Sequence, residues 1–179
     1  MNKLILSSAL AATLLSSTVF ADSNFYLGGS IGQTEVDYVP EAGATVTDDS
    51  DTSWKIFGGY NINENFAVEV AYQDLGDNSA VVLGQPTYID GDALSISLVG
   101  KLPINDQFGL FGKLGYADVE ADADVPSINA SVSASDSDVL YGIGAVYSVT
   151  EAVDVRLEWE HIDLADEIDT VSLGVSYNF

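Results

Sequence analysis

The stretch WKIFGGYNINENFAVEVAYQDLG at residues 54–76 decides the fold of this chain. Apolar and aromatic side chains dominate every second position on each side of a short polar segment, residues 61–65. A period of two places these side chains on one face of an extended strand, and mainly Ser, Gly, Ala and single charged residues on the other. An asparagine-rich segment between two such runs is typical of a turn. We therefore predict a β-hairpin with two chemically different faces.

The same alternation recurs along the chain, and we expect eight strands of about ten residues each. A tilted strand of that length crosses the hydrocarbon core of a bilayer. Bacterial outer-membrane barrels formed by one chain have an even number of strands, which eight satisfies. The expected strands are 25–36, 52–61, 65–73, 93–102, 107–117, 139–148, 153–161 and 170–179.

The connections between these strands alternate in length. Short turns at one end and long loops at the other are the asymmetry of outer-membrane barrels, whose long loops face outward. We therefore expect an all-β fold, an eight-stranded antiparallel up-and-down transmembrane β-barrel. The expected turns are 61–65, 103–106 and 149–152, and the expected loops are 37–51, 74–92, 118–138 and the shorter 162–169.

A soluble ligand-binding barrel also alternates, with its apolar face inward, so the second face distinguishes the two architectures. A face in water would carry many Lys and Glu side chains. Here that face is mostly Gly, Ser and Ala, which suits the narrow interior of an eight-stranded barrel. The apolar face carries aromatic residues near the strand ends, as an interfacial girdle does. They are Trp54, Tyr60, Phe66, Tyr72, Phe108, Tyr116, Tyr141, Tyr147, Trp159 and Tyr177.

Residues 1–21 have the layout of a secretory signal peptide. Lys3 precedes an apolar run rich in Ser and Ala, and Val19-Phe20-Ala21 is a cleavage-site pattern. A transmembrane helix is the alternative interpretation, but the run is short for one. We expect export, with a signal peptide at 1–21 and an outer-membrane barrel domain at 22–179.

The composition excludes several classes of protein. The 179 residues include 28 Asp and Glu but only 5 Lys and Arg, a net charge of −23, while 47% are hydrophobic. So many apolar residues argue against an acidic disordered tail. So few cations argue against a nucleic-acid partner. The absence of Cys excludes disulfides, thiolate metal sites and Cys nucleophiles.

After residue 21 the chain has three lysines and one arginine, and by the strand alternation all four point inward. A buried cation is costly unless it is paired and hydrogen-bonded, so we expect carboxylates beside them. We favour a structural plug, because eight strands leave an interior filled by side chains. A gate or narrow polar pore is the alternative. The expected lumen ion-pair cluster comprises Lys55, Glu69, Lys101, Lys113, Arg156 and Glu158.

The long loops are rich in carboxylates and contain no Lys or Arg. We interpret them as a solvated acidic surface, which could reach lipopolysaccharide phosphates only through bridging divalent cations. Neither of the two acidic runs fits the EF-hand pattern, and we predict no metal site and no cofactor. The weak candidates for Ca²⁺ or Mg²⁺ are Asp48, Asp49, Asp51, Asp118, Glu120, Asp122 and Asp124.

An enzyme is the least favoured class. His161 is the single histidine, with Asp163 two residues beyond it, and Ser is abundant. A Ser–His–Asp arrangement is therefore open in principle, but nothing in the sequence places a Ser at a nucleophile turn. A lipid-acting outer-membrane enzyme ranks third, behind a structural or surface-interaction barrel and a narrow pore for ions or small solutes.

Three segments resemble a known family: residues 54–76, RLEWEHIDL at 156–164 and VSLGVSYNF at 171–179. They are similar to the transmembrane domain of OmpA-like outer-membrane proteins and the small barrels related to them. In that family, inward Lys, Arg and Glu form a salt-bridge network, which implies that role for the lumen cluster. The resemblance also implies that Tyr177 and Phe179 belong to an aromatic-ending signal read by the barrel-assembly machinery.

Members of this family serve as structural proteins, adhesins or small porins. We expect an outer-membrane location, contact with outer-membrane lipid and with lipopolysaccharide through divalent cations, and a monomer. The sequence stops at Phe179 without a peptidoglycan-binding domain, so we do not expect anchoring to the cell wall. Our leading prediction is a membrane component with a structural or surface-interaction role, and not an enzyme.

Overall fold

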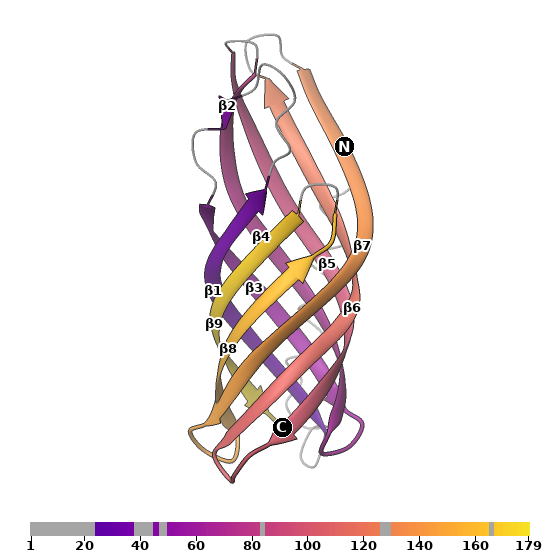
Figure 1. Ribbon diagram of the computed structural model, residues 1–179, viewed down its shortest axis with the longest axis vertical. Helices are drawn as coiled ribbons and strands as arrows, with labels where there is room; N and C mark the ends of the chain where they lie inside the picture. The colour runs from indigo at the N-terminus through magenta and orange to yellow at the C-terminus, as the bar shows by residue number, and fades with distance from the viewer. Residues whose placement is uncertain (1–23, 38–44, 47–49, 83–84, 126–129, 165–166) are drawn as a thin grey trace.

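The chain forms a closed β-barrel (Figure 1). The computed structural model describes residues 24–37, 45–46, 50–82, 85–125, 130–164 and 167–179, so the expected signal peptide at 1–21 lies outside the described residues. Within these ranges, no helix has the length and apolar character needed to span a membrane. The strands are β1 (Phe25–Asp37), β2 (Thr45–Val46), β3 (Ser50–Asn61), β4 (Phe66–Val82), β5 (Gln85–Pro103), β6 (Phe108–Val125), β7 (Ala130–Ser148), β8 (Val153–Ile162) and β9 (Glu167–Asn178).

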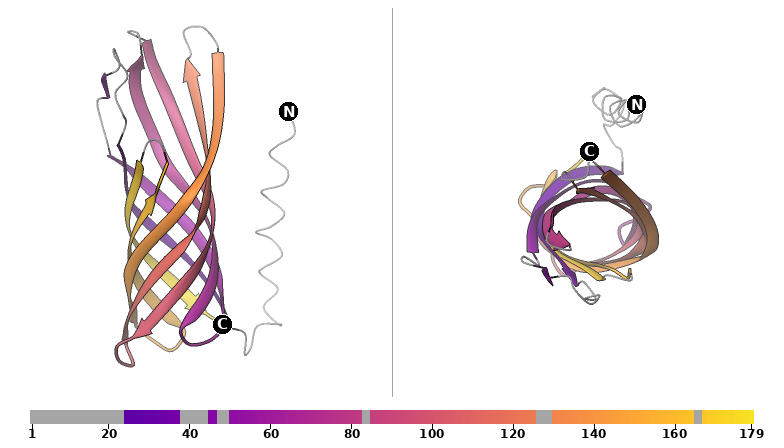
Figure 2. Two further views of the ribbon diagram at one scale, coloured as in Figure 1. Left: turned by 45° about the vertical axis from the view of Figure 1, so that its right-hand side comes forward. Right: turned by 90° about the horizontal axis from the view of Figure 1, so that it is seen from above.

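Eight long strands make the ring, and every neighbouring pair is antiparallel. β1 pairs with β3, each later strand pairs with the next, and β9 closes the ring on β1. The view from above shows this continuous ring (Figure 2). β2 adds two residues that pair with the far end of β4. The expectation of an eight-stranded antiparallel up-and-down barrel is confirmed, and β2 is an addition that the sequence pattern did not indicate.

The two faces of the barrel wall follow the predicted alternation. Outward aliphatic side chains are largely exposed, for example Leu114 at 62% and Ile143 at 63%, whereas inward Phe57 and Val99 are almost fully buried. A continuous apolar surface of this kind is unfavourable in water and suits contact with lipid. Aromatic residues lie toward both ends of this surface and aliphatic residues lie between them, as in the girdles of membrane barrels.

Two segments that the sequence predicted as loops, 74–92 and 118–138, are mostly strand. The β4–β5 pairing continues past an irregularity at Gly76, where φ is +88°, and the β6–β7 pairing reaches Val125 and Ala130. β4 to β7 therefore extend beyond the other strands at one end of the barrel (Figure 1). Asp is a poor strand former, but its alternation with Ala and Val fits a pleated ribbon whose backbone hydrogen bonds are already in register.

One side chain organises each of the three short turns at the other end. Asn105 Oδ1 accepts hydrogen bonds from the backbone N–H groups of Gln107 (3.0 Å) and Phe108 (2.9 Å). Asn63 and Thr150 accept from residues two and three positions ahead in the same way. Such side chains replace backbone contacts that a tight turn leaves open. These turns therefore fix the register with which the neighbouring strands enter the barrel.

The capping role of Asn105 leads to a first prediction. Asn105→Ala removes the acceptor of both backbone hydrogen bonds and should lower the free energy of unfolding by about 1–2 kcal/mol. The neighbouring exposed Asp106→Ala serves as the control and should leave the free energy of unfolding nearly unchanged. Urea unfolding of both variants in lipid vesicles measures the difference, and equal stabilities would contradict the assigned role.

Candidate functional site: a charge cluster in the barrel lumen

The inward face brings six charged side chains from four strands to one level of the lumen. Three are cations and three are carboxylates, so the cluster is neutral when all six are ionised. Each side chain is at most 8% exposed. Opposite charges in contact offset much of the cost of removing each ion from water. The lumen charge cluster consists of Lys55 on β3, Glu69 on β4, Lys113 on β6, and Arg156, Glu158 and Glu160 on β8.

Glu158 is the central carboxylate of this cluster because it contacts all three cations. Its Oε1 lies 2.8 Å from Lys55 Nζ and 2.5 Å from Lys113 Nζ, and its Oε2 lies 2.8 Å from Arg156 Nη2. Glu160 is paired with both lysines, at 3.3 Å from Lys55 Nζ and in direct contact with Lys113. The two glutamates of β8 therefore connect β3 and β6 across the lumen.

Arg156 joins the remaining carboxylate to the cluster. Its Nη1 donates to Glu69 Oε2 at 2.6 Å and its Nη2 donates to Glu69 Oε1 at 3.2 Å, which is a bidentate pair. The Tyr26 hydroxyl donates to the same Glu69 at 2.8 Å. The guanidinium lies between the rings of Phe57 and Phe111, 4.7 and 4.2 Å from their centroids. These contacts hold Arg156 in one position.

Glycines on the inner wall provide the room for these large side chains. A Cβ on Gly144 would lie about 2.3 Å from the ring of Phe111 and 2.4 Å from the carbonyl oxygen of Leu157. A Cβ on Gly142 would crowd the Trp159 carbonyl and the stem of Lys113. Gly144 and Gly142 are the direct cross-strand neighbours of Phe111 and Lys113, so the absence of these Cβ atoms lets both side chains lie over the adjacent strand β7.

Further buried side chains pack next to the cluster in the lumen. Toward the extended end, Thr34 and Thr170 hydroxyls are 2.9 Å apart, and Gln73 Nε2 donates to Thr170 at 3.1 Å. Two buried apolar groups complete the packing. One is formed by Leu75, Ala93, Ala117, Val119, Leu140, Ile162 and Ile168, and the other by Tyr26, Phe57, Ala67, Ala71, Val99 and Phe111.

The structure brings five of the six residues predicted from the sequence into the cluster. Lys101 lies apart from it, and no carboxylate of the described residues is within 4.0 Å of its ammonium. The register explains the difference. Lys101 on β5 lies opposite Phe111 on β6, whereas Lys113 lies opposite Val99, so Lys101 is two positions nearer the β5–β6 turn than Lys113. Glu160 belongs to the cluster although it was not among the six residues predicted for it. Its spacing of two from Glu158 is the signal that could have identified it.

His161 does not take part in a catalytic arrangement in the described residues. Its Nδ1 lies 3.1 Å from Asp169 Oδ1, and its ring packs against Tyr141, 4.8 Å between centroids. Residues 28–32, GGSIG, match the G-x-S-x-G pattern that surrounds the nucleophilic Ser of many hydrolases. These residues lie within strand β1, not at the strand-to-helix turn that exposes such a nucleophile, and the Ser30 hydroxyl oxygen is buried.

The acidic residues considered as metal ligands do not converge in the described part of the chain. No group of three His, Asp or Glu side chains there has a metal-binding arrangement. Asp118 and Glu120 are exposed and lie two positions apart on the same face of β6. The rise of a strand separates the Cα atoms of two such positions by roughly 7 Å. Asp51 accepts a hydrogen bond from the backbone of Thr52. Asp122 and Asp124 continue β6, and Asp48 and Asp49 lie outside the described residues.

The proposed assembly signal lies at the end of β9. Tyr177 and Phe179 are about half exposed, with ring centroids 5.0 Å apart. Both belong to the outward apolar face at the short-turn end of the barrel, and their recognition by assembly machinery stays a prediction.

A closed antiparallel barrel with an apolar outer face and a paired charge cluster in its lumen defines an integral outer-membrane β-barrel protein. The chain matches the model of the outer membrane protein beta-barrel domain over residues 7–179. It belongs to this family, and its location is the outer membrane.

Two relatives illustrate the range of the family. The attachment invasion locus protein of Yersinia enterocolitica is 28% identical over 185 residues, covering 100% of both chains. Outer membrane protein A of Shigella flexneri is 28% identical over 184 residues, which cover 88% of this chain and 49% of that protein. The chain thus spans about half the length of the outer membrane protein A relatives. These relatives are named as outer-membrane or attachment proteins and not as enzymes.

The fold is also shared with solved structures. Ail, the attachment invasion locus protein of Yersinia pestis, in complex with the heparin analogue sucrose octasulfate, has a TM-score of 0.61 and 19% sequence identity. The match covers 87% of this chain and 99% of that one. At this identity the similarity shows the fold alone.

The central position of Glu158 leads to a second prediction. Glu158→Gln keeps the shape but leaves three buried cations with two carboxylates, and it should lower the free energy of unfolding by about 3–5 kcal/mol. Glu151→Gln in the exposed turn at 149–152 is the matched control and should unfold like the parent. Urea unfolding in lipid vesicles gives both values. A parent-like stability of Glu158→Gln would show that the cluster does not hold the barrel together.

Proposed function

We propose that this protein is a closed structural barrel that presents a surface for interaction outside the cell, and that its lumen does not conduct. The observation that carries the proposal is the neutral lumen charge cluster, whose buried side chains pair across the interior and pack next to two buried apolar groups. Side chains fill the interior of eight-stranded barrels, whereas larger barrels enclose channels.

The proposed orientation places the three short turns in the periplasm and the extended β4–β7 region outside the cell. In this scheme residues 1–21 direct export and are removed after Ala21. The barrel-assembly machinery then recognises Tyr177 and Phe179 at the end of β9. The folded protein acts as a monomer, since its ring closes within one chain and offers no free seam between β1 and β9.

The charge of the outer region suggests what the surface contacts. No Lys or Arg occurs in residues 114–155, which include most of the β6–β7 extension, while Asp118, Glu120 and Asp136 are exposed there. Ail is similar in fold and has been solved with a sulfated heparin analogue. A polyanion of that kind would be repelled by this chain. We propose that the outer surface instead binds cationic partners directly, and lipopolysaccharide phosphates through divalent cations.

Asp74, Asp92 and Glu120 support the second part of this proposal. They are direct cross-strand neighbours on β4, β5 and β6, so three like charges lie side by side. Tyr72, whose hydroxyl donates to Asp92 at 3.2 Å, places this row beside the aromatic girdle. Like charges in such positions destabilise a sheet unless counter-ions reduce their repulsion. Divalent cations between this row and lipid phosphates would do so.

Planar-bilayer recording distinguishes the closed barrel from the narrow pore. The parent protein should give no steady single-channel events, because the charge cluster and its packed neighbours close the lumen. Arg156→Ala removes the side chain between Phe57 and Phe111 and should produce small, steady events. Steady conductance of the parent that is unchanged in Arg156→Ala would favour the pore and contradict the proposal.

Binding of a fluorescent lysine oligomer to the protein in bilayer nanodiscs tests the surface charge. The oligomer should bind in low salt and dissociate as ionic strength rises, because exposed charges are screened. The double variant Asp118→Asn/Glu120→Gln should bind it several-fold more weakly. Glu64→Gln/Asp106→Asn removes two charges at the opposite end and is the matched control. Stronger binding of heparin than of the lysine oligomer, without divalent cations, would refute the proposed partner class.

A further inference from the structure

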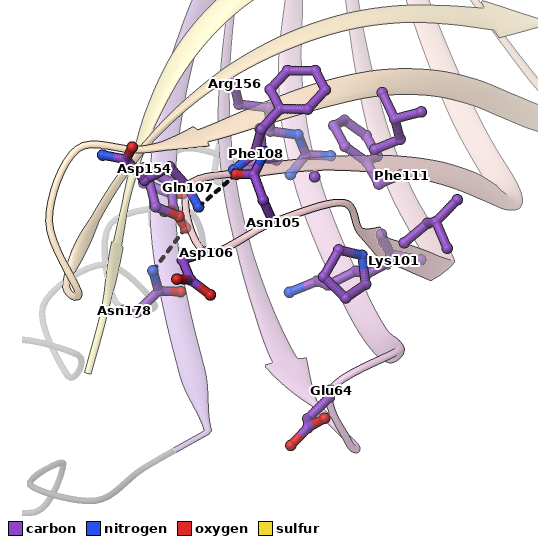
Figure 3. Close-up of a pocket in the computed structure, with 18 of the residues that line it drawn as sticks. Glu64, Lys101, Asn105, Asp106, Gln107, Phe108, Phe111, Asp154, Arg156 and Asn178 are labelled. Atoms are coloured by element: carbon purple, nitrogen blue, oxygen red, sulfur yellow. Dashed lines mark hydrogen bonds between the residues drawn. The ribbon is translucent and has the colours of Figure 1, made fainter.

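A cavity of about 240 Å³ lies between the lumen charge cluster and the short turns (Figure 3). Its inner wall includes Arg156 and Tyr26, and its outer end reaches the turn that contains Asn105 and Asp106. We call this cavity the vestibule. It is separate from the charge cluster, because Arg156 contributes to both but the other ion-paired residues of the cluster do not line it.

Lys101 faces the vestibule with few partners for its charge. Its Nζ donates to Asn61 Oδ1 at 2.6 Å and lies 4.8 Å from the centroid of the Tyr26 ring. An ammonium group has three N–H donors, and in the described part of the chain only this one acceptor is within hydrogen-bond distance. The Lys101 ammonium group can therefore donate to an anionic group bound in the vestibule.

Asp154 lies on the other side of the same cavity (Figure 3). Its Oδ1 accepts from the Ser148 hydroxyl at 2.7 Å and its Oδ2 accepts from Asn178 Nδ2 at 2.8 Å. Both donors are neutral, and no cation of the described residues is within 4.0 Å of this carboxylate. A carboxylate can accept about four hydrogen bonds, so Asp154 retains capacity for a cationic group.

Arg156 also lines the inner wall, but its charge is already paired. Its terminal nitrogens are occupied by Glu69 and Glu158, and its Nε is buried. Lys101 is therefore the cation of the vestibule wall that is open to an anionic group.

We propose that the vestibule binds small zwitterions of the amino-acid type, with the carboxylate held by Lys101 and the ammonium group held by Asp154. Inside the rim, Lys101 and Asp154 have opposite charges, both line the same cavity, and neither has an ion pair within 4.0 Å among the described residues. A simple anion would leave Asp154 without compensation and would meet the acidic side chains of Glu64 and Asp106 at the rim. A simple cation would leave Lys101 without compensation. A zwitterion provides a partner of opposite charge for both groups.

Solution NMR of the isotopically labelled full-length barrel in detergent micelles tests the site, with 4-aminobutyrate as the probe. Butyrate and butylammonium carry one charge each and serve as the matched ligands. The probe should cause saturable shifts at Lys101, Ser148 and Asp154, and each single-charge ligand should bind about tenfold more weakly. This experiment does not depend on the proposed orientation or on closure of the lumen.

Variants separate the two halves of the site. Asp154→Asn and Lys101→Gln should each lower the affinity for 4-aminobutyrate about tenfold. The conservative Lys101→Arg should retain most of that affinity. Asp118→Asn, on the exposed far end of β6, removes the same charge as Asp154→Asn and should bind like the parent. Backbone spectra report folding of each variant, and Lys101→Arg keeps the test valid if Lys101→Gln does not fold.

Three results would overturn the proposal. The first is the absence of shifts at vestibule residues up to about 50 mM of the probe, a concentration far above the dissociation constant of a useful site. The second is butyrate binding as tightly as 4-aminobutyrate with no loss in Asp154→Asn, which would define a simple anion site. The third is equal weakening by Asp154→Asn and Asp118→Asn, which would indicate a general charge effect.

Discussion

A fully buried charge inside this barrel must be met by an opposite charge, and that requirement organises the molecule. The interior is narrow, and the wall faces lipid, so a buried cation has no water to replace a missing partner. Three cations and three carboxylates meet at one level and leave no net charge there. Because these residues come from β3, β4, β6 and β8, their pairing ties together strands on different sides of the ring.

The membrane imposes a second constraint, which the closed ring satisfies. No water in the hydrocarbon core can pair with free backbone groups, so every strand needs two neighbours at that depth. The β9–β1 pairing provides the last of these contacts. With each long strand of the described residues paired on both sides, side-chain chemistry divides by face. Aliphatic and aromatic residues face lipid, and glycine, serine, alanine and the charge cluster face inward.

The period-two pattern was sufficient to predict the fold and most of the lumen. Parity alone placed Lys55, Glu69 and Arg156 on the inner face. It could not predict that Lys101 would lie apart, because the level of a residue along the barrel depends on strand register, which one strand's sequence does not contain. It also missed the strands within 74–92 and 118–138. There the low strand propensity of Asp and Ser was outweighed by hydrogen bonding to neighbours already in register.

The central claim is that oppositely charged residues of the lumen stabilise the barrel through one another. A double-mutant cycle between Glu69 and Arg156 measures this directly, using Glu69→Gln, Arg156→Met and the double variant in urea unfolding from lipid vesicles. The account predicts a coupling energy of about 2 kcal/mol or more, with the double variant less impaired than the two single effects added together. Additive effects, with a coupling energy near zero, would contradict it.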